Sequence, residues 1–348
     1  MKKRISLLLA LAMVFCCLAL TGCGGKKQTM TLYTWAEMFP EEILSGFTKE
    51  TGIEINYVNF DTDESMLAKL EAAEGGDYDI IIADDYILET AIAEGLVKKL
   101  DTSKIKNYGN LDPAFMSEYY DPNNEYTVPY GAGIMEIVYY PEKVGFEIKG
   151  YEDLWNSALE GKLGIIANPR VINGMALKRL GYSFNTTNES EIREAEKLLY
   201  DLAPNIRLIK DDFINDDLVA GEIDAAFCYT SNGTIAKLTD PNIKITLPDE
   251  GLGYGIMGMF IPSKAPNEDA AYKFIDYIND AENAAKCFEH LGYYCTNKAA
   301  SALISDEIKE MVTLPENVSD DREMIENIPG EIYDIHEEIW TQFKNLCG

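Results

Sequence analysis

The sequence predicts an α/β protein of two lobes, each a doubly wound sheet flanked by helices. Short apolar strands alternate with amphipathic helices from Thr31 to about Gly95, and this β-α-β-α-β-α order is typical of a parallel sheet. The third strand, at 78–83, is almost continuously apolar, as expected for a strand that is covered on both faces. A chain of 348 residues is too long for one ordinary core, so we expect a second lobe.

The chain opens with a basic start and an apolar run. Residues 2–4 are Lys-Lys-Arg, and roughly sixteen mostly apolar residues follow, which is the pattern of a secretory signal and too short for a membrane span. The run ends in Leu20-Thr21-Gly22-Cys23, which resembles a bacterial lipobox and implies acylation of Cys23. We expect a signal peptide at 1–22 and a lipidated tether at 23–30. The mature chain would then be anchored outside the cytoplasmic membrane, and an ordinary signal peptide with an incidental cysteine is the alternative.

Local signals define the elements of the first lobe. Pro40 and the acids after it begin a helix, because proline suits the first turn and acids favour the positive helix end, and Gly52 ends it. The polar residues 61–65 cap the next helix, which stops at a Gly-Gly pair. The expected elements are a strand at 31–34, a helix at 40–51, a strand at 53–60, a helix at 66–74, a strand at 78–83 and a helix that runs to about 95.

Candidate ligand contacts follow the strands of this sheet. In doubly wound sheets, ligands bind beyond the carboxyl ends of the strands. Trp35 follows the first strand, and Asp84, Asp85 and Tyr86 follow the third.

Two crossings between the lobes are predicted. Residues 128–133 lead into the second lobe, and 259–262, after a glycine-rich stretch, lead back. The expected division is 31–132 plus 259–305 for lobe 1 and 133–258 plus 306–348 for lobe 2. Further strands are expected at 134–140, 163–166, 206–210, 225–229 and 243–247, and further helices at 171–180, 189–202, 216–220, 269–280, 281–291, 298–303 and 330–346.

Net charge and cysteine content limit the possible binding partners and disulfide bonds of the protein. The net charge of −29 argues against nucleic acid as a partner, because binding it requires a cationic face, whereas a negative field attracts cationic ligands. Solubility alone also explains many acidic surfaces. Export permits disulfides, and Cys287 and Cys295 are close enough in sequence to pair, but connectivity among Cys228, Cys287, Cys295 and Cys347 does not follow from spacing.

The sequence contains no catalytic constellation. Its two histidines, His290 and His336, belong to no metal motif, and the nucleophile elbow and the phosphate loop are absent from the sequence. The acidic runs near 61–64 and 211–217 lack calcium-loop spacing and are better explained as turns and helix caps. We therefore expect a binding protein rather than an enzyme, with no cofactor and no metal. Aromatic rings beside carboxylates suit an organic cation, which favours Trp35, Tyr86 and Tyr229 as contacts.

Several short motifs together resemble the bacterial spermidine/putrescine-binding proteins of ABC importers, over about residues 31 to 305. They are Tyr33-Thr-Trp-Ala-Glu37, Phe47-Thr-Lys-Glu-Thr-Gly-Ile-Glu54, Tyr78-Asp-Ile-Ile-Ile82, Asn110-Leu-Asp-Pro113, Asp121-Pro-Asn-Asn124, Val128-Pro-Tyr130 and Leu180-Gly-Tyr-Ser183. The resemblance implies a two-lobed periplasmic-binding-protein fold of type II, a ligand cleft between lobes that close on binding, and delivery to a membrane permease. It also implies a monomer.

The resemblance implies a set of ligand contacts and also some departures. The implied contacts are Trp35, Glu37, Asp84, Asp85, Tyr86, Asn168, Tyr229, Tyr254, Met257 and Tyr293. Carboxylates implied at the positions of Asn168, Val171 and Met257 are missing, and Asp84, Asp85 or Glu136 are the candidate replacements. The resemblance implies a polyamine as the ligand, and the missing carboxylates leave alternatives open. The alternatives are another small cation or zwitterion (an amino-acid derivative, a quaternary amine or an aminophosphonate) or a ligand-sensing surface lipoprotein.

Overall fold

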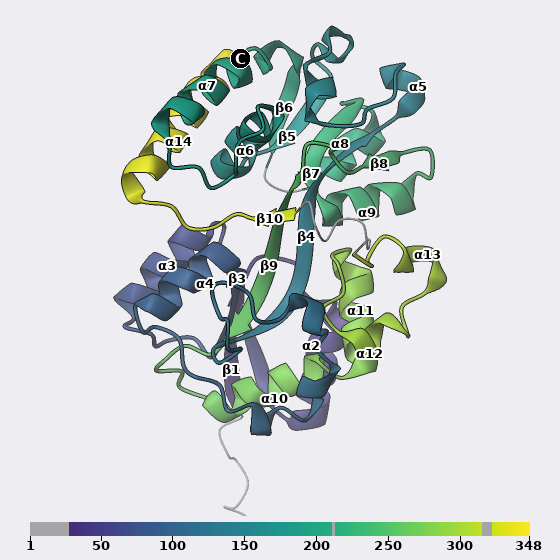
Figure 1. Ribbon diagram of the computed structural model, residues 1–348. Helices are drawn as coiled ribbons and strands as arrows, with labels where there is room; N and C mark the ends of the chain where they lie inside the picture. The colour runs from purple at the N-terminus through teal and green to yellow at the C-terminus, as the bar shows by residue number, and fades with distance from the viewer. Residues whose placement is uncertain (1–27, 211–212, 315–321) are drawn as a thin grey trace, which may run out of the picture.

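The structure is a computed structural model, and it describes residues 28–210, 213–314 and 322–348. Over these residues, ten strands form one mixed sheet with the order β2-β1-β3-β9-β4-β7-β5-β6, in which β10 pairs with β9 and β8 pairs with β4. Figure 1 shows the sheet running through both lobes, with helices packed around it at each end. The signal peptide and the lipidation site, Cys23, lie outside the described residues.

Lobe 1 is the part built around the parallel strands β2, β1 and β3. The glycine that ends the first helix has the left-handed conformation, since Gly52 has φ 73° and its N–H donates to the carbonyl of Thr48. The first elements of lobe 1 are β1 (Thr29–Thr34), α2 (Glu41–Thr51), β2 (Glu54–Asn59), α3 (Asp63–Ala72), β3 (Ile80–Asp84) and α4 (Asp85–Ala93). Its later helices are α10 (Glu268–Ile278), α11 (Ala281–Leu291), α12 (Lys298–Ser301) and α13 (Asp306–Lys309).

Lobe 2 is the part built around the parallel strands β7, β5 and β6. Its elements are α5 (Pro141–Val144), β5 (Leu163–Ile166), α6 (Pro169–Arg179), α7 (Glu189–Tyr200), β6 (Ile206–Lys210), α8 (Ile214–Ala220), β7 (Ala225–Tyr229), α9 (Thr230–Thr239), β8 (Lys244–Thr246) and α14 (Gly330–Leu346). Short 3₁₀ turns at Tyr151–Trp155, Ser157–Leu159 and Ala203–Asn205 connect them, and those at Thr102–Lys104, Lys106–Asn110 and Pro113–Phe115 lie in lobe 1.

The long strands β4 (Thr127–Tyr139) and β9 (Leu252–Phe260) join the two halves of the sheet. The first part of β4 pairs with β9, whereas the part from Met135 onward pairs with β7. Strand β9 pairs with both β3 and β4. Strand β4 therefore belongs to both lobes. We retain the predicted crossings and domain boundaries as a proposal, except that α13 (Asp306–Lys309), which was predicted in lobe 2, is grouped with lobe 1 because Ile308 packs against α11 and α12.

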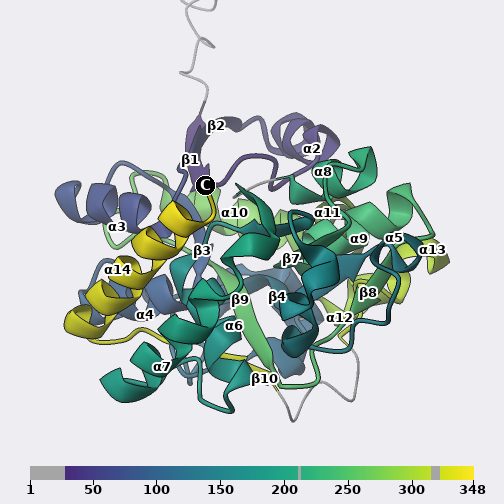
Figure 2. The same cartoon turned by 90° about the horizontal axis from the view of Figure 1, so that it is seen from above.

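Separate apolar cores fill the two lobes. One cluster combines residues of β4 to β7 and α6 to α9 with Ile339, Trp340 and Phe343 of α14. Two others combine residues of β1 to β3 with α2, α4 and α10. A further cluster places Ile308 and Val312 against α11 and α12. Figure 2, viewed from above, shows α14 lying alongside the other lobe 2 helices.

Most predicted elements have the predicted type. The glycine-rich stretch 251–258 lies mainly in β9, since only Gly251 precedes the strand, and α3 begins at Asp63 rather than at 66. Strand β10 (Arg322–Met324) was not predicted, because three polar and mixed residues carry no strand pattern. Among the described residues, no helix is long and apolar enough to cross a membrane.

Candidate ligand-binding site between the lobes

The carboxyl ends of strands from both lobes meet at the junction between them. In lobe 1, β3 ends at Asp84 and α4 follows at once, and in lobe 2, β7 ends at Tyr229. Asn168 caps the start of α6, where its Oδ1 accepts from the N–H of Val171 at 3.1 Å. Its Nδ2 donates to the hydroxyl oxygen of Tyr229 at 3.2 Å, so both ends of this amide are engaged.

Tyr229 is the lobe 2 residue that faces the carboxylates of lobe 1. Its pKa lies well above the ordinary value because the ring is buried, and the negative charges of Asp84 and Asp63 raise it further. Tyr293 acts on it in the same direction. Charged groups of lobe 1 therefore act electrostatically on a ring of lobe 2.

Asp63 and Asp84 form a carboxyl pair at this junction. The N–H of Asp84 donates to Oδ1 of Asp63 at 3.3 Å, and the two carboxyl groups also hydrogen-bond to each other. Burial raises the pKa of Asp63 well above its usual range and that of Asp84 to about 6, and Glu64 adds to both effects. In the described part of the chain, neither residue forms an ion pair with lysine or arginine. Both carboxyl groups therefore favour the protonated form, and each disfavours a charge on the other.

Tyr86 lies beside the same acids. Its hydroxyl donates to Oε1 of Glu64 at 3.1 Å. Burial raises the pKa of Tyr86 well above the usual value, and the negative charges of Asp63, Glu64 and Asp84 raise this pKa further. The ring therefore lines a strongly negative environment.

Asp85 has a different set of partners. Its Oδ2 accepts from the N–H of Ile256 on β9 at 2.9 Å, and its Oδ1 accepts from the N–H of Tyr86 at 2.8 Å. The side chain is 3% exposed, so this carboxylate joins α4 to β9 within the fold.

The loop after β1 holds Trp35 half-buried. The ring packs against Phe60 with centroids 4.9 Å apart, and the hydroxyl of Tyr57 donates to the carbonyl of Trp35 at 2.8 Å. Glu37 has an exposed side chain and a left-handed backbone with φ 59°, and its carbonyl lies 2.8 Å from Nε2 of His290.

The remaining predicted residues lie along β9 and β4. Met257 is directly opposite Asp84 across the β3–β9 pair, and its Cε lies close to Gly131 of β4. Tyr293 covers Gly133, where an added Cβ would meet its ring at 2.9 Å. Tyr254 is 1% exposed and lies under the guanidinium of Arg322, 4.3 Å from the ring centroid.

The structure thus brings together Asp84, Tyr86, Asn168, Tyr229, Met257 and Tyr293. Trp35 packs against the apolar clusters on which Tyr86 and Tyr293 also pack. The side chain of Glu37 is exposed, and that of Tyr254 is buried under Arg322.

Sequence reasoning missed Asp63 and Glu64, which it assigned to a turn and a helix cap. Their signal was their position directly after the second parallel strand, at the same edge of the sheet as Trp35 and Asp84. In the described ranges, no group of three or more His, Cys, Asp and Glu residues is arranged to hold a metal ion. Cys228, Cys287, Cys295 and Cys347 are free thiols.

Comparison with known proteins gives consistent matches. The profile of the family described as "Bacterial extracellular solute-binding protein" matches residues 42–316. The chain is 32% identical over 320 residues to the spermidine/putrescine-binding periplasmic protein of Escherichia coli K12, which covers 91% of this chain and 92% of the relative. It is 30% identical over 325 residues to a protein of Haemophilus influenzae with the corresponding name, covering 89% of each.

Solved structures share the fold. A putative spermidine/putrescine ABC transporter protein from Listeria monocytogenes superposes with a TM-score of 0.85 at 30% identity, covering 91% of this chain and 99% of that one. The spermidine/putrescine ABC transporter substrate-binding protein of Streptococcus pneumoniae gives 0.81 at 29% identity, covering 92% and 100%. The fold is therefore the two-lobed fold of periplasmic binding proteins, as the sequence predicts.

Proposed function

The chain belongs to the bacterial extracellular solute-binding protein family, and from this premise we propose that it captures a polyamine and delivers it to the permease of an ABC importer. The family transports solutes and is not a class of enzymes. The relatives are named for spermidine and putrescine, and the acidic junction of this chain suits such cations.

One observation carries the polyamine assignment. Asp63 is buried and Asp84 half-buried beside Tyr86 and Tyr229, and within the described residues neither acid forms an ion pair with lysine or arginine. An ammonium group would supply the missing positive charge through charge-assisted hydrogen bonds, and aromatic rings attract both its charge and its methylene groups.

We assign roles accordingly. Trp35, Tyr86 and Tyr229 stack on the ligand, and Asp84 pairs with one ammonium, with Glu37 as the exposed alternative. Met257 on β9 lies opposite Asp84 on β3. Asp84 could therefore replace the carboxylate that the resemblance implies at position 257. The proposed contacts also include Asn168, Met257 and Tyr293. Asp85 and Tyr254, the other two predicted residues, are almost fully buried and would support the site from within the fold.

The location and state of the protein are part of the same proposal. Cleavage before Cys23 and acylation of that residue would hold a monomeric two-lobed body at the outer face of the cytoplasmic membrane or in the periplasm. No catalysis, cofactor or metal is part of this function.

Calorimetric titration of residues 24–348 tests the proposal. Spermidine and putrescine should bind with a Kd of about 1 μM or tighter, about −8 kcal/mol, while amino acids, quaternary amines and aminophosphonates should bind far more weakly. No heat with polyamines, and binding of another ligand from this panel, would contradict the polyamine assignment.

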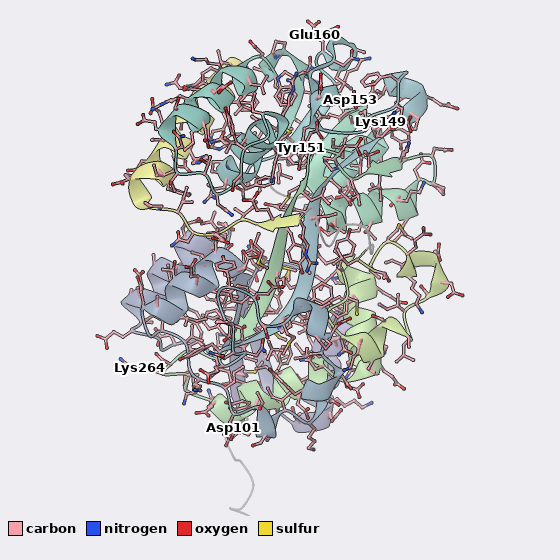
Figure 3. All side chains as sticks on the ribbon, viewed as in Figure 1. Asp101, Lys149, Tyr151, Asp153, Glu160 and Lys264 are labelled. Carbon is pink, nitrogen blue, oxygen red and sulfur yellow. The ribbon has the colours of Figure 1, made fainter. Side chains whose placement is uncertain are left out.

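A matched pair of variants sharpens the titration. Asp84→Asn should weaken polyamine binding by about tenfold to a hundredfold, the loss expected when a charged hydrogen-bond partner is neutralised. Glu160→Gln, at the outer end of lobe 2 in Figure 3, changes the net charge equally and should leave the affinity unchanged.

A further inference from the structure

A third segment also spans the junction between the lobes. Strand β10 and residues 325–329, which we call the strap (322–329), lead from lobe 1 to the start of α14 in lobe 2. Figure 1 shows the strap, in yellow, crossing between α4 and the helices of lobe 2. Its first end is fixed near the lobe crossing, because β10 pairs with β9 from Arg322 to Met324.

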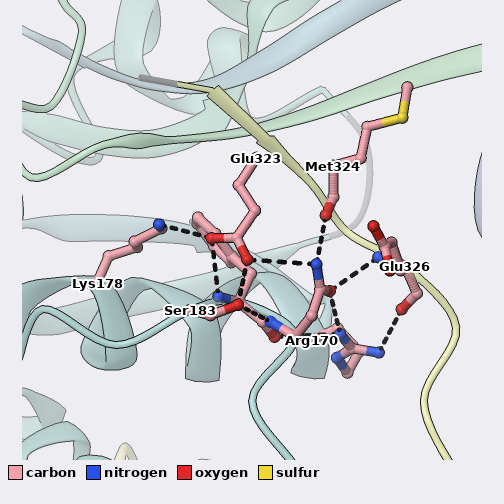
Figure 4. Close-up of polar contacts among 8 residues, drawn as sticks. Arg170, Lys178, Ser183, Glu323, Met324 and Glu326 are labelled. Atoms are coloured by element: carbon pink, nitrogen blue, oxygen red, sulfur yellow. Dashed lines mark hydrogen bonds and ion pairs between the residues drawn. The ribbon is translucent and has the colours of Figure 1, made fainter. Parts of the chain in front are cut away.

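The strap is held tightly on lobe 2. Glu323 forms an ion pair with Lys178 of α6 at 2.6 Å and accepts hydrogen bonds from the hydroxyl of Ser183 and the N–H of Phe184. The amide of Asn185 donates to the carbonyl of Met324 at 2.7 Å and accepts from the N–H of Glu326 at 2.8 Å. Figure 4 shows this network.

Arg170 completes the anchorage. Its guanidinium donates to the carbonyl of Glu326 at 3.1 Å and to Phe184 and Asn185 at 3.2 Å each. The side chain is only 9% exposed, and burial lowers its pKa to about 10. A buried cation that is held by carbonyl and amide oxygens fixes backbone positions, so the strap moves with α6.

The strap touches lobe 1 at its far end. The amide of Asn327 donates to the hydroxyl of Thr90 on α4 at 3.3 Å, and its backbone lies beside the carboxylate of Glu89. Glu326 lies near enough to raise the pKa of Glu89, after burial, so this contact also brings two like charges together. The contact is exposed and slight compared with the anchorage on lobe 2.

The two contacted helices are the ones that begin at the ligand site. Helix α4 begins directly after Asp84 and carries Tyr86 one turn before Thr90. Helix α6 begins directly after Asn168, and Asn168 lies two residues before Arg170. A strap that is fixed to one helix and docked on the other holds both sides of the site together.

We propose that the strap is a latch in which Asn327, positioned by Arg170, fastens lobe 1 to lobe 2 in the closed state and sets the rate of ligand release. Asn327 and Arg170 act as positioning residues, without touching the ligand. The proposal rests on the proposed function only in requiring a ligand that is held between the lobes.

Stopped-flow measurement of spermidine release tests the latch. Asn327→Ala and Thr90→Val should each speed release by about two- to tenfold, as loss of one hydrogen bond predicts, with unchanged association rates and melting temperatures. The double variant should be no faster than either single variant, because both remove the same contact. Glu326→Gln should slow release, because it removes the repulsion from Glu89.

Asn123→Ala, an exposed asparagine in a turn of lobe 1, is the matched control and should change nothing. Unchanged release in both single variants, or effects that add fully in the double variant, would overturn the latch.

A disulfide test does not depend on which ligand binds. Thr90→Cys combined with Asn327→Cys should cross-link under mild oxidation, whereas either single variant should not. A yield that rises with a bound ligand supports the latch, and failure to cross-link in any state overturns it. Cross-linking that is insensitive to polyamines, with no polyamine heat, would leave the latch standing and contradict the proposed function.

Discussion

At the residue scale, neighbouring acids at the junction have different roles. Asp85 uses both oxygens on backbone N–H groups of α4 and β9, and it therefore contributes to the fold. Asp63 and Asp84 instead lie beside each other with raised pKa values, and neither forms an ion pair within the described residues. Type and position alone did not distinguish Asp84 from Asp85, because only the packed structure shows which oxygens are already occupied.

Ligand binding should release a proton from the Asp63–Asp84 pair. An ammonium favours the ionised form of the Asp63–Asp84 pair, so near pH 6 the affinity should rise with pH and binding should expel protons. Calorimetric titrations in two buffers of different ionisation enthalpy measure the number of protons released on binding. Asp63→Asn should abolish the release, and a wild-type protein that releases no proton at pH about 6 would contradict the raised pKa values of the pair.

The same pair should affect stability in the opposite direction. Its folded-state pKa values lie above those of the unfolded chain, so its stabilising effect is fully present below pH about 4 and is lost as pH rises through about 6. His336 works against this trend, because burial lowers its pKa to about 4. Thermal unfolding of wild type and of Asp63→Asn/Asp84→Asn should therefore be compared at each pH. The wild-type advantage without ligand should shrink between pH about 4 and about 7, and a constant difference would refute the shift.

The ring of Trp35 should contribute to polyamine binding. Trp35→Ala should weaken polyamine binding by about tenfold to a hundredfold, because a buried aromatic contact is lost, while Trp35→Phe should recover much of the affinity. Calorimetry gives both values, and an alanine variant that binds as wild type would remove Trp35 from the site.

At the element scale, sequence patterns predicted strands and helices wherever burial has a regular period. The continuous apolar run of β3 and the capped helix α2 are clear examples. Strand β10 could not be predicted, since its pairing with β9 and the contacts of Glu323 arise only from segments far apart in sequence. The predicted start of α3 was three residues too late, because the polar residues 61–65 were taken as a capping loop. Asp63 was therefore missed as a residue of the site.

Strand β4 should tolerate no side chain at Gly133. A Cβ there would meet the ring of Tyr293 at 2.9 Å, at the place where β4 leaves β9 for β7. Gly133→Ala should displace Tyr293 and weaken ligand binding by about tenfold, as for other overpacked positions that cost roughly 1–3 kcal/mol. Gly109→Ala, where nothing lies within 4 Å of the added carbon, is the control and should keep wild-type affinity.

At the scale of the whole molecule, charge and topology act together. The formal charge of −29 surrounds a junction that already carries several buried acids. The two-lobed fold could be predicted from alternation and length, whereas the single sheet through both lobes could not, because it depends on the pairing of β4 with β9.

Association with polyamines should therefore depend on salt. Raising ionic strength from about 20 mM to about 500 mM should slow spermidine association more than putrescine association, since the trivalent ion feels the field more strongly. Stopped-flow rates at several salt concentrations measure this, and equal slopes for the two ligands would exclude long-range steering.

The position of α14 has a consequence for biogenesis. Ile339, Trp340 and Phe343 complete the core of lobe 2, while β9 and α10, made long after β1, complete lobe 1. Neither core can close while most of the chain is still being synthesised, because its last contributors have not yet left the ribosome. A nascent polypeptide of this design stays unfolded late, which is the condition that a translocation channel requires of its cargo.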